Sequence, residues 1–268
     1  MQPITRGEFV RFQRFILDHA GITLADSKQA LVTGRLGKRL NHHHIESYGE
    51  YCDLLQGGTA PDEVQIAVDL LTTNETYFFR EPKHFEFLRE QAVAARAAGR
   101  GFRVWSAASS SGEEAYSVAM VLADCLGEAP WEVLGTDISL QVLQRAARGV
   151  YPMERARHVP PAFLRRFCLK GTDRFDGTLL ISKDLRRRVR FGQVNLNEPL
   201  PDVGTFDLVL LRNVMIYFSN ETKQGVVSRV ATTIRHGGHF CIGHSETLNG
   251  LNHALEQLAP SIYRRAGP

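Results

Sequence analysis

The chain has 268 residues, which is enough for one large domain or for a large and a small one. Of these residues, 43% are hydrophobic and 23% are charged, as in ordinary globular proteins. The sequence has no run of about 18 apolar residues, so we expect no transmembrane helix, and its net charge of +3 is too small to indicate nucleic-acid binding by itself. The four cysteines are widely spaced and form no CxxC motif, so we expect free thiols. The N-terminal residues lack the apolar stretch of a signal peptide, so we expect a cytoplasmic protein.

The first part of the sequence shows a helical pattern. Apolar residues recur at helical spacing over 9–17, and Asp26 or Ser27 is placed to cap a helix that ends near Leu40. Strand-like alternation is absent here, so we predict an N-terminal helical domain over 1–85. Further helices are expected over 47–55 and 62–71.

From Gly101 onward, short apolar runs alternate with helical segments. This alternation implies a mostly parallel sheet with helices on both faces, so we predict an α/β domain over 95–268. Gly171, Gly177 and alternating apolar residues indicate a small hairpin-bearing insertion over 160–192. The last two strands are separated by a helical stretch and are expected to form an antiparallel edge. The expected strands cover 103–107, 132–136, 189–194, 207–211, 239–243 and 261–264, and the expected helices cover 113–125, 140–147 and 222–234.

The first candidate binding element is the segment RVWSAASSSGEEAYSVAM, residues 103–120. An apolar strand runs into a loop of alanines and serines with one glycine, and then into an amphipathic helix. Small residues let a ligand approach the backbone, and a helix N-terminus offers free N–H groups. The loop lacks the GxGxxG pattern, which disfavours pyrophosphate binding. The alternative is an ordinary strand–helix turn in which Ser111 and Glu114 form a capping box.

Polar residues also follow later strands, at the edge where open α/β sheets bind ligands. Asp137 ends the second strand and is placed to accept both ribose hydroxyls of a nucleoside, although a helix N-cap is the alternative. Asn195 is placed to hydrogen-bond an adenine edge, and Leu196 to pack on its ring. A surface turn explains this pair equally well.

A fourth group of residues follows the strand at 207–211. Arg212, Asn213 and Tyr217 are expected near the same sheet edge. The alternative is that an asparagine and a tyrosine after a buried strand serve as a cap and a core aromatic.

Taken together, these residues closely resemble the chemotaxis receptor methyltransferases of the CheR family, and the match covers nearly the whole chain. The resemblance implies a helical N-terminal domain, a Rossmann-like α/β domain that binds S-adenosylmethionine, and a small β-subdomain inserted within it. The organisation expected from periodicity agrees with all three. The motifs that carry the resemblance are LTTNETYFFRE (71–81), WSAASSSGEEAYS (105–117), DISLQVLQRAARGVY (137–151), RNVMIYF (212–218) and GHSETL (243–248).

The resemblance implies roles for residues in these motifs. Asn74, Thr76 and Arg80 look like the residues that close over the cofactor, and Glu114 matches the glutamate near the methionine moiety. Arg80 and Tyr217 would lie nearest the reacting methyl group and are the expected catalytic residues. The expected cofactor-binding set is Asn74, Thr76, Arg80, Glu114, Asp137, Asn195, Leu196, Arg212 and Asn213.

The implied reaction transfers the methyl group of S-adenosylmethionine to glutamate γ-carboxylates of chemoreceptors, for chemosensory adaptation, and leaves S-adenosylhomocysteine. Such a carboxylate is ionised at neutral pH, so its oxygen needs no general base. The enzyme must mainly align the reactants. Arg80 would hold one carboxylate oxygen, and Tyr217 would wall the pocket or donate a hydrogen bond.

The expected partners are the glutamate-rich cytoplasmic helices of chemoreceptors. Lys28, Arg35 and Arg39 fall within about 40° on a helical wheel and would present a basic, substrate-binding face, unless this is an ordinary solvated face. Some family members also bind a short C-terminal receptor peptide by strand addition to the β-subdomain, and KGTDRFDGTLLI (170–181) has a compact loop of that kind. We expect a monomer, no nucleic acid, no membrane insertion and no metal, since the histidines at 42–44 are contiguous and do not share a helix face.

Other functions stay open on the sequence. A methyltransferase of the same fold could act on another protein, a small molecule or nucleic acid, although no basic groove with stacking aromatics is evident. A non-catalytic sensor of S-adenosylmethionine or its product is a further alternative, which intact Arg80 and Tyr217 argue against. A nicotinamide dehydrogenase fits poorly because the glycine fingerprint is missing.

Overall fold

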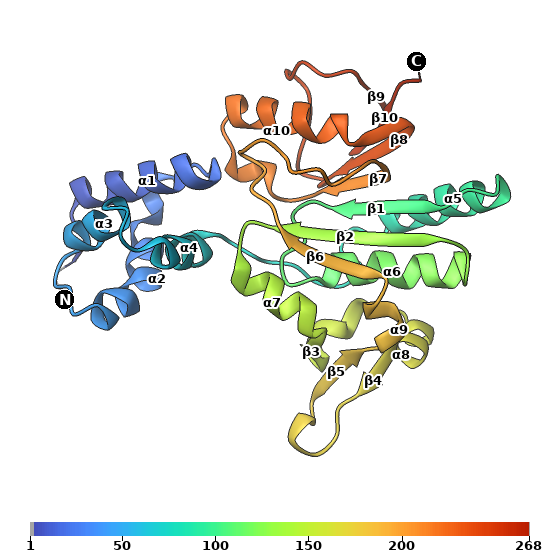
Figure 1. Ribbon diagram of the computed structural model, residues 1–268, viewed down its shortest axis with the longest axis horizontal. Coiled ribbons are helices and arrows are strands. Elements are labelled where there is room, and N and C mark those ends of the chain that lie inside the picture. The colour runs from blue at the N-terminus through green and yellow to red at the C-terminus, as the bar shows by residue number, and fades with distance from the viewer. Residues whose placement is uncertain (1–2, 268) are drawn as a thin grey trace.

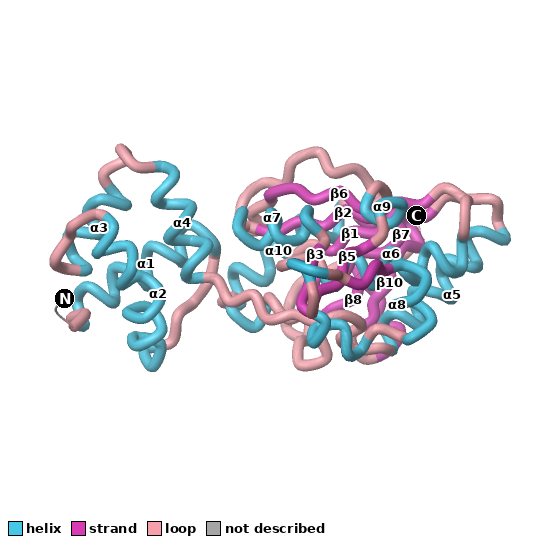
Figure 2. Tube along the Cα trace, turned by 90° about the horizontal axis from the view of Figure 1, so that it is seen from below, coloured by secondary structure: helices cyan, strands magenta, loops and turns pink. Residues whose placement is uncertain are grey.

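The computed structural model describes residues 3–267, which form two bodies joined by the segment after α4 (Figures 1 and 2). The first body is helical. Thr5 and Glu8 form a capping box at its first helix, Ser47 caps the third, and Pro61 opens the fourth. Apolar faces of these helices share one core. The elements are α1 (Arg6–Ala20), the 3-10 turn η1 (Asp26–Lys28), α2 (Gln29–His42), α3 (Tyr48–Gln56) and α4 (Pro61–Leu71).

The second body is built on a seven-stranded sheet in the order β6-β2-β1-β7-β8-β10-β9. The strands from β6 to β8 run parallel, and β10 is antiparallel to β8 and β9. The chain reverses its direction of travel across the sheet between β1 and β7, which is where open α/β sheets bind ligands. The strands are β1 (Phe102–Ser106), β2 (Trp131–Asp137), β6 (Val189–Gln193), β7 (Phe206–Leu211), β8 (Ile234–Ile242), β9 (Leu255–Ala259) and β10 (Ile262–Arg265).

Alternating side chains on the strands supply two cores. On β7, Leu208 and Leu210 pack into a core with α5 and α6, whereas Val209 and Leu211 pack into a core with α10 and the helical body. Both faces of the parallel sheet are therefore covered. The helices around it are α5 (Lys83–Ala97), α6 (Glu113–Leu126), α7 (Leu140–Arg148), the 3-10 turn η4 (Met215–Tyr217) and α10 (Asn220–Thr232).

A small antiparallel sheet in the order β3-β5-β4 projects from the second body (Figure 1). It lies in the chain between α7 and β6. Its central strand β5 pairs with both neighbours, so the outer edges of β3 and β4 carry no strand partner among the described residues. The elements of this subdomain are β3 (Val150–Pro152), η2 (Met153–His158), α8 (Pro161–Phe167), β4 (Cys168–Lys170), η3 (Asp173–Phe175), β5 (Thr178–Ile181) and α9 (Lys183–Arg186).

This architecture confirms the expected α/β class with a helical N-terminal part and a small inserted sheet, and the antiparallel pairing of β8 with β10. The prediction of a helical stretch between these two strands was wrong, because residues 255–259 form the edge strand β9. The domain limits 1–85, 95–268 and 160–192 stay predictions. Within residues 3–267, no helix combines the length and the apolar character needed to cross a membrane.

Candidate functional site

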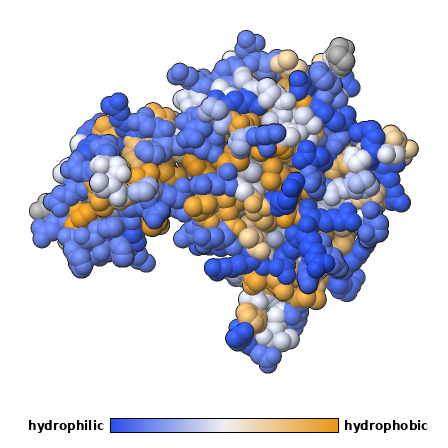
Figure 3. Space-filling view, viewed as in Figure 1, coloured by the Kyte–Doolittle hydropathy of each residue, from blue (hydrophilic) through white to orange (hydrophobic). Residues whose placement is uncertain are grey.

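A cleft of about 860 Å³, part of it open solvent, lies at the carboxyl ends of the central strands, between the two bodies. On the face drawn in Figure 3, apolar residues gather at the junction of these bodies. The helical body and its linker line the cleft with Ala20, Ile22 and residues 72–76 and Arg80, and the sheet lines it with Ala107, Ala108, Ser110, Glu114, Asp137, Ile138, residues 194–196 and 212–214, Tyr217 and Phe218.

Asp137 is a buried carboxylate at the end of β2, 7% exposed. Its Oδ2 accepts a hydrogen bond from the Ser110 amide at 2.9 Å, and its Oδ1 accepts one from the Ser139 amide at 3.0 Å. Burial raises the pKa of Asp137, while these amide donors act in the opposite direction. The N-cap of α7 is Ser139, which excludes the N-cap alternative for Asp137.

The loop between β1 and α6 packs closely against α7 and β3. Its glycine, Gly112, has a φ of +94°, and a Cβ there would lie 2.8 Å from the Cβ of Ala146 and 2.9 Å from the Tyr151 hydroxyl. The capping box considered for Ser111 and Glu114 does not form. Gly112 occupies the N-cap position, and the Ser111 hydroxyl donates to Glu113 instead.

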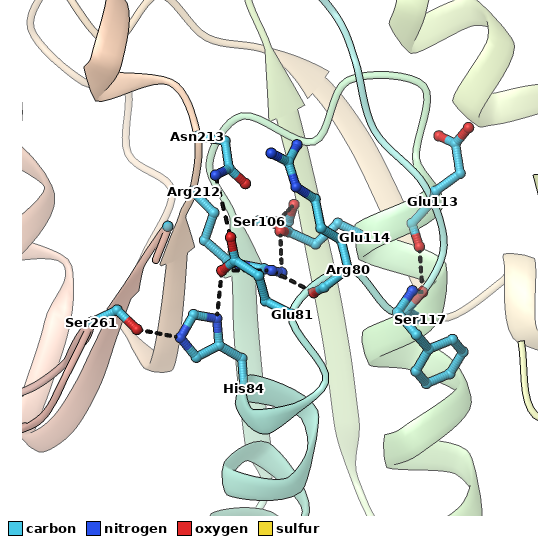
Figure 4. A network of polar contacts seen from close by, with 12 residues as sticks. Arg80, Glu81, His84, Ser106, Glu113, Glu114, Ser117, Arg212, Asn213 and Ser261 are labelled. Carbon is cyan, nitrogen blue, oxygen red and sulfur yellow. Dashed lines mark hydrogen bonds and ion pairs between the residues drawn. The ribbon is translucent and has the colours of Figure 1, made fainter. Parts of the chain in front are cut away.

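A buried arginine joins three of the sequence motifs (Figure 4). The side chain of Arg212 is 1% exposed and lies 2.9 Å from a carboxylate oxygen of Glu114 and 3.0 Å from one of Glu81. It also donates to the carbonyl oxygen of Arg80. The second Glu114 oxygen accepts from the Ser106 hydroxyl at 2.7 Å. Arg212 therefore fixes the segment containing Arg80 against β1, α6 and β7.

Glu81 and His84 are the residues that sequence reasoning missed in this network. Glu81 accepts hydrogen bonds from the Asn213 side chain and from the His244 amide. His84 is 1% exposed, with Nε2 2.8 Å from the Ser261 hydroxyl and Nδ1 3.4 Å from a Glu81 oxygen. Burial, aided by Arg212, lowers the pKa of His84 to about 4. Glu81 stood within the LTTNETYFFRE motif, whereas no local pattern marked His84.

Non-glycine residues with positive φ recur in the segments that carry the cleft and the Arg212 network. Non-glycine residues with positive φ are uncommon and often belong to functional sites. Five of the seven in the described chain belong to the segments just described: Phe79, Glu81, Ser110, Asn213 and Ser261. Hydrogen bonds from their backbone amides hold three of them: Phe79 donates to the Ser117 hydroxyl, Ser110 to Asp137 and Asn213 to Glu246.

The residues predicted for catalysis and for the cofactor all line this cleft, and their individual roles stay predictions. Asn195 differs from expectation in one respect. Its side-chain amide donates to the His19 carbonyl at 2.7 Å and to Glu198 at 3.0 Å, and its oxygen accepts from the Asn197 amide. The side-chain amide that was expected to hydrogen-bond adenine therefore already has hydrogen-bond partners within the protein.

The residues of the predicted basic face are only partly on α2, and two of them have partners within the protein. Lys28 lies in η1, before α2 begins. Arg35 donates to the carbonyl oxygens of residues 71 and 72 at 3.1 and 2.8 Å. Arg39 binds the buried Glu63 at 2.8 Å. The two arginines thus make contacts within the helical body and its linker, and the substrate-binding role of Lys28, Arg35 and Arg39 stays a prediction.

Two family models match the chain: "CheR methyltransferase, all-alpha domain" over residues 7–72 and "CheR methyltransferase, SAM binding domain" over residues 74–263. The chain belongs to the CheR methyltransferase family. Curated relatives agree. The chemotaxis protein methyltransferases of Salmonella typhimurium and Escherichia coli are 37% and 38% identical over 97% of this chain and 90% and 91% of their own lengths. Chemotaxis protein methyltransferase 2 of Pseudomonas aeruginosa is 38% identical over 98% of this chain and 94% of its own.

This CheR-family protein is therefore an S-adenosylmethionine-dependent methyltransferase. The chemistry of the cleft lining suits the cofactor. The buried Asp137 carboxylate, predicted to accept the ribose hydroxyls, lines the cleft together with the small residues Ala107, Ala108 and Ser110.

Proposed function

We propose that this methyltransferase converts glutamate γ-carboxylates of chemoreceptors into methyl esters, with the cofactor bound in the cleft. Curated relatives named chemotaxis protein methyltransferases support the receptor as substrate. The observation that carries the glutamate assignment is the set of ionisable groups that line the cleft. Arg80 is a cation there, and neither histidine nor lysine is among the described residues of the lining.

That set favours an acceptor that needs no deprotonation. The acids of the lining are Glu75, Glu114 and Asp137, of which Glu114 is paired with Arg212 and Asp137 with two amides. Carboxylates are weak bases for activating an alcohol or an ammonium group. A glutamate side chain, already ionised at neutral pH, avoids this requirement.

The residues of the chain would then mainly bind, orient and exclude water. The bound cofactor supplies an electrophilic methyl group on its sulfonium. Arg80 is half-buried, and its guanidinium is held by the Glu75 carbonyl at 3.2 Å. It would orient one oxygen of the acceptor by a charge-assisted hydrogen bond, since a clamp on both oxygens would lower nucleophilicity. Tyr217 would wall the same end of the cleft. Charge is neutralised in the reaction, so a cleft that excludes water favours it.

The β-subdomain offers a second contact for a receptor. The outer edge of β4 has unpaired backbone groups suited to strand addition, and its Leu169 is 58% exposed. We include in the proposal that a C-terminal receptor peptide binds here and that the enzyme works as a cytoplasmic monomer. Titration with an acidic-aromatic pentapeptide by calorimetry tests the peptide site, and absence of heat at high peptide concentration would remove it.

The proposed reaction is tested by incubating the protein with methyl-labelled S-adenosylmethionine and membranes that contain candidate receptors. We expect label in the receptor band and its release as methanol in mild base, because carboxyl methyl esters are base-labile. Receptors with glutamine or alanine at the methylated positions serve as controls. Base-stable label would indicate another acceptor, and binding of the cofactor without any transfer would indicate a sensor.

A further inference from the structure

A carboxylate of the helical body binds the start of a helix in the second body. Asp69 lies on α4, and its two oxygens accept hydrogen bonds from the backbone amides of Leu140 and Gln141, each at 3.1 Å. These amides belong to the first turn of α7 and have no partner within their own helix. The negative charge also suits the positive end of the helix dipole. Asp69 thus caps α7 from across the boundary between the bodies, where α4 faces α7 (Figure 1).

Two glutamines reinforce this contact. Gln65, one turn before Asp69 on α4, donates to Asp69 at 2.7 Å and to the Ile138 carbonyl at 3.1 Å. Gln193, at the end of β6, donates to the Gln65 side chain at 2.7 Å and to the same carbonyl at 3.0 Å. The contact therefore joins α4 to the turn between β2 and α7, the turn that carries Asp137.

The opposite flank of the cleft is closed by different contacts. Ile22, just after α1, forms a β-bridge with Phe218, and the Thr23 amide donates to the Tyr217 carbonyl at 2.8 Å. The cleft lies between this flank and the Asp69 flank, with Ile22 lining one side and Ile138 the other. A molecule held there would therefore contact both bodies.

We propose that Asp69 is a positioning residue for the cofactor. Its hydrogen bonds to the first turn of α7, which we call the clasp, hold the helical body against the β2–α7 turn and thereby slow release of S-adenosylmethionine and its product. The inference rests on the proposed placement of the cofactor in this cleft. The clasp acts on the ribose end, because the turn it fixes presents the Asp137 carboxylate and the Ser139 amide that holds it. It does not touch the Arg80 end, where the transfer step is proposed.

The substitution Asp69→Asn removes the charge and leaves one oxygen to accept. Loss of a helix cap of this kind corresponds to about 5- to 10-fold in an equilibrium constant. We expect S-adenosylhomocysteine to dissociate about 5- to 10-fold faster from the full-length variant, and its Kd to rise in proportion. The KM for S-adenosylmethionine should rise likewise, whereas kcat at saturating cofactor should change less than twofold.

The experiment measures binding and release of S-adenosylhomocysteine by stopped-flow fluorescence or surface-immobilised protein, with thermal unfolding of the ligand-free protein in parallel. Asp62→Asn is the matched control, since it removes an exposed negative charge from the same helix and should leave release unchanged. Gln65→Leu removes the hydrogen bonds from Gln65 to Asp69 and to the Ile138 carbonyl. This variant should speed release by a smaller factor, and it provides a second test should Asp69→Asn fold poorly.

Unchanged release and Kd in both variants, with or without a lower unfolding temperature, would overturn the clasp and leave Asp69 with a purely structural role. A fall in kcat with unchanged KM would also overturn it. A separate variant tests the proposed position of the cofactor. If Asp137→Asn binds S-adenosylhomocysteine with the Kd of the unaltered protein, that position is rejected, independently of the results for the Asp69 variants.

Discussion

At the scale of single residues, Asp137 has the environment of a ligand-binding carboxylate. It is buried, it is an acceptor for two amides, and it faces the cleft. Asp137→Asn keeps the shape of the side chain and removes the charge. We expect S-adenosylhomocysteine affinity to fall by about 1–3 kcal/mol, because hydroxyls buried against the cleft lose a charged acceptor. Calorimetric titration measures this, with the exposed Asp18→Asn as control, and an unchanged Kd would reject the ribose assignment.

A second prediction concerns Arg80, at the other end of the cleft. Arg80→Ala removes the cation that would orient the acceptor, so we expect kcat for receptor methylation to fall by about 10- to 100-fold, in line with the strength of charged hydrogen bonds. The Kd for S-adenosylhomocysteine should change much less. Arg80→Lys should restore part of the rate, because it restores a charge without the planar donor geometry. A wild-type rate in the alanine variant would remove the proposed catalytic role.

Residue-level reasoning from the sequence succeeded where strand ends determine position. Asp137 and Arg212 follow strands, so their approach to one sheet edge follows from the parallel order. It failed to find the ion-pair partner of Arg39, which the helical wheel placed on a basic face for the substrate. Its partner, Glu63, lies 24 residues later on another helix, and only the packing of α2 on α4 brings the two together. His84 was missed for the same reason, since Ser261 is 177 residues away.

At the scale of secondary-structure elements, the β1–α6 connection depends on one glycine. Gly112→Ala would place a Cβ at 2.8–2.9 Å from Ala146 and Tyr151, at a φ of +94°. We expect destabilisation of about 1–3 kcal/mol and weaker cofactor binding, because the loop that lines the cleft must shift. Chemical denaturation with a parallel binding assay measures both effects.

The matched control for this substitution is Gly34→Ala in the middle of α2. A Cβ there meets nothing within 4 Å, and the backbone is helical. Alanine should therefore stabilise the protein by about 0.5–1 kcal/mol. Equal effects of the two substitutions would contradict the role given to the Gly112 conformation.

Element-level reasoning succeeded for the long periodic segments, such as α6 and β7, and failed at β9. Apolar residues at 251, 254, 255 and 258 fit helical spacing. In the structure, Leu255 pairs opposite Arg265 and Glu256 opposite Arg264, and the Arg264 guanidinium lies 2.7 Å from Glu256. Pairing with β10 determines the conformation there, and a single-segment pattern contains no information about that partner.

At the scale of the whole molecule, two buried histidines couple stability to pH. Burial, aided by Arg212, lowers the pKa of His84 to about 4 despite Glu81, and burial, aided by Arg235 and Arg264, lowers that of His239 to about 4. In the unfolded chain each histidine has a pKa near 6.5. Between these values the unfolded state binds more protons than the folded state, so the free energy of unfolding must fall as pH falls.

Each such histidine contributes a slope of up to about 1.4 kcal/mol per pH unit within that window. We therefore expect the free energy of unfolding to decrease steadily from pH 6.5 to pH 4.5 and to be less sensitive to pH from 7 to 8. Asp137, whose pKa burial raises, acts in the opposite direction. Urea unfolding at half-unit pH steps measures the slope. His84→Asn should reduce the slope by up to about 1.4 kcal/mol per pH unit. A slope that His84→Asn leaves intact would mean that His84 is already protonated in the folded protein.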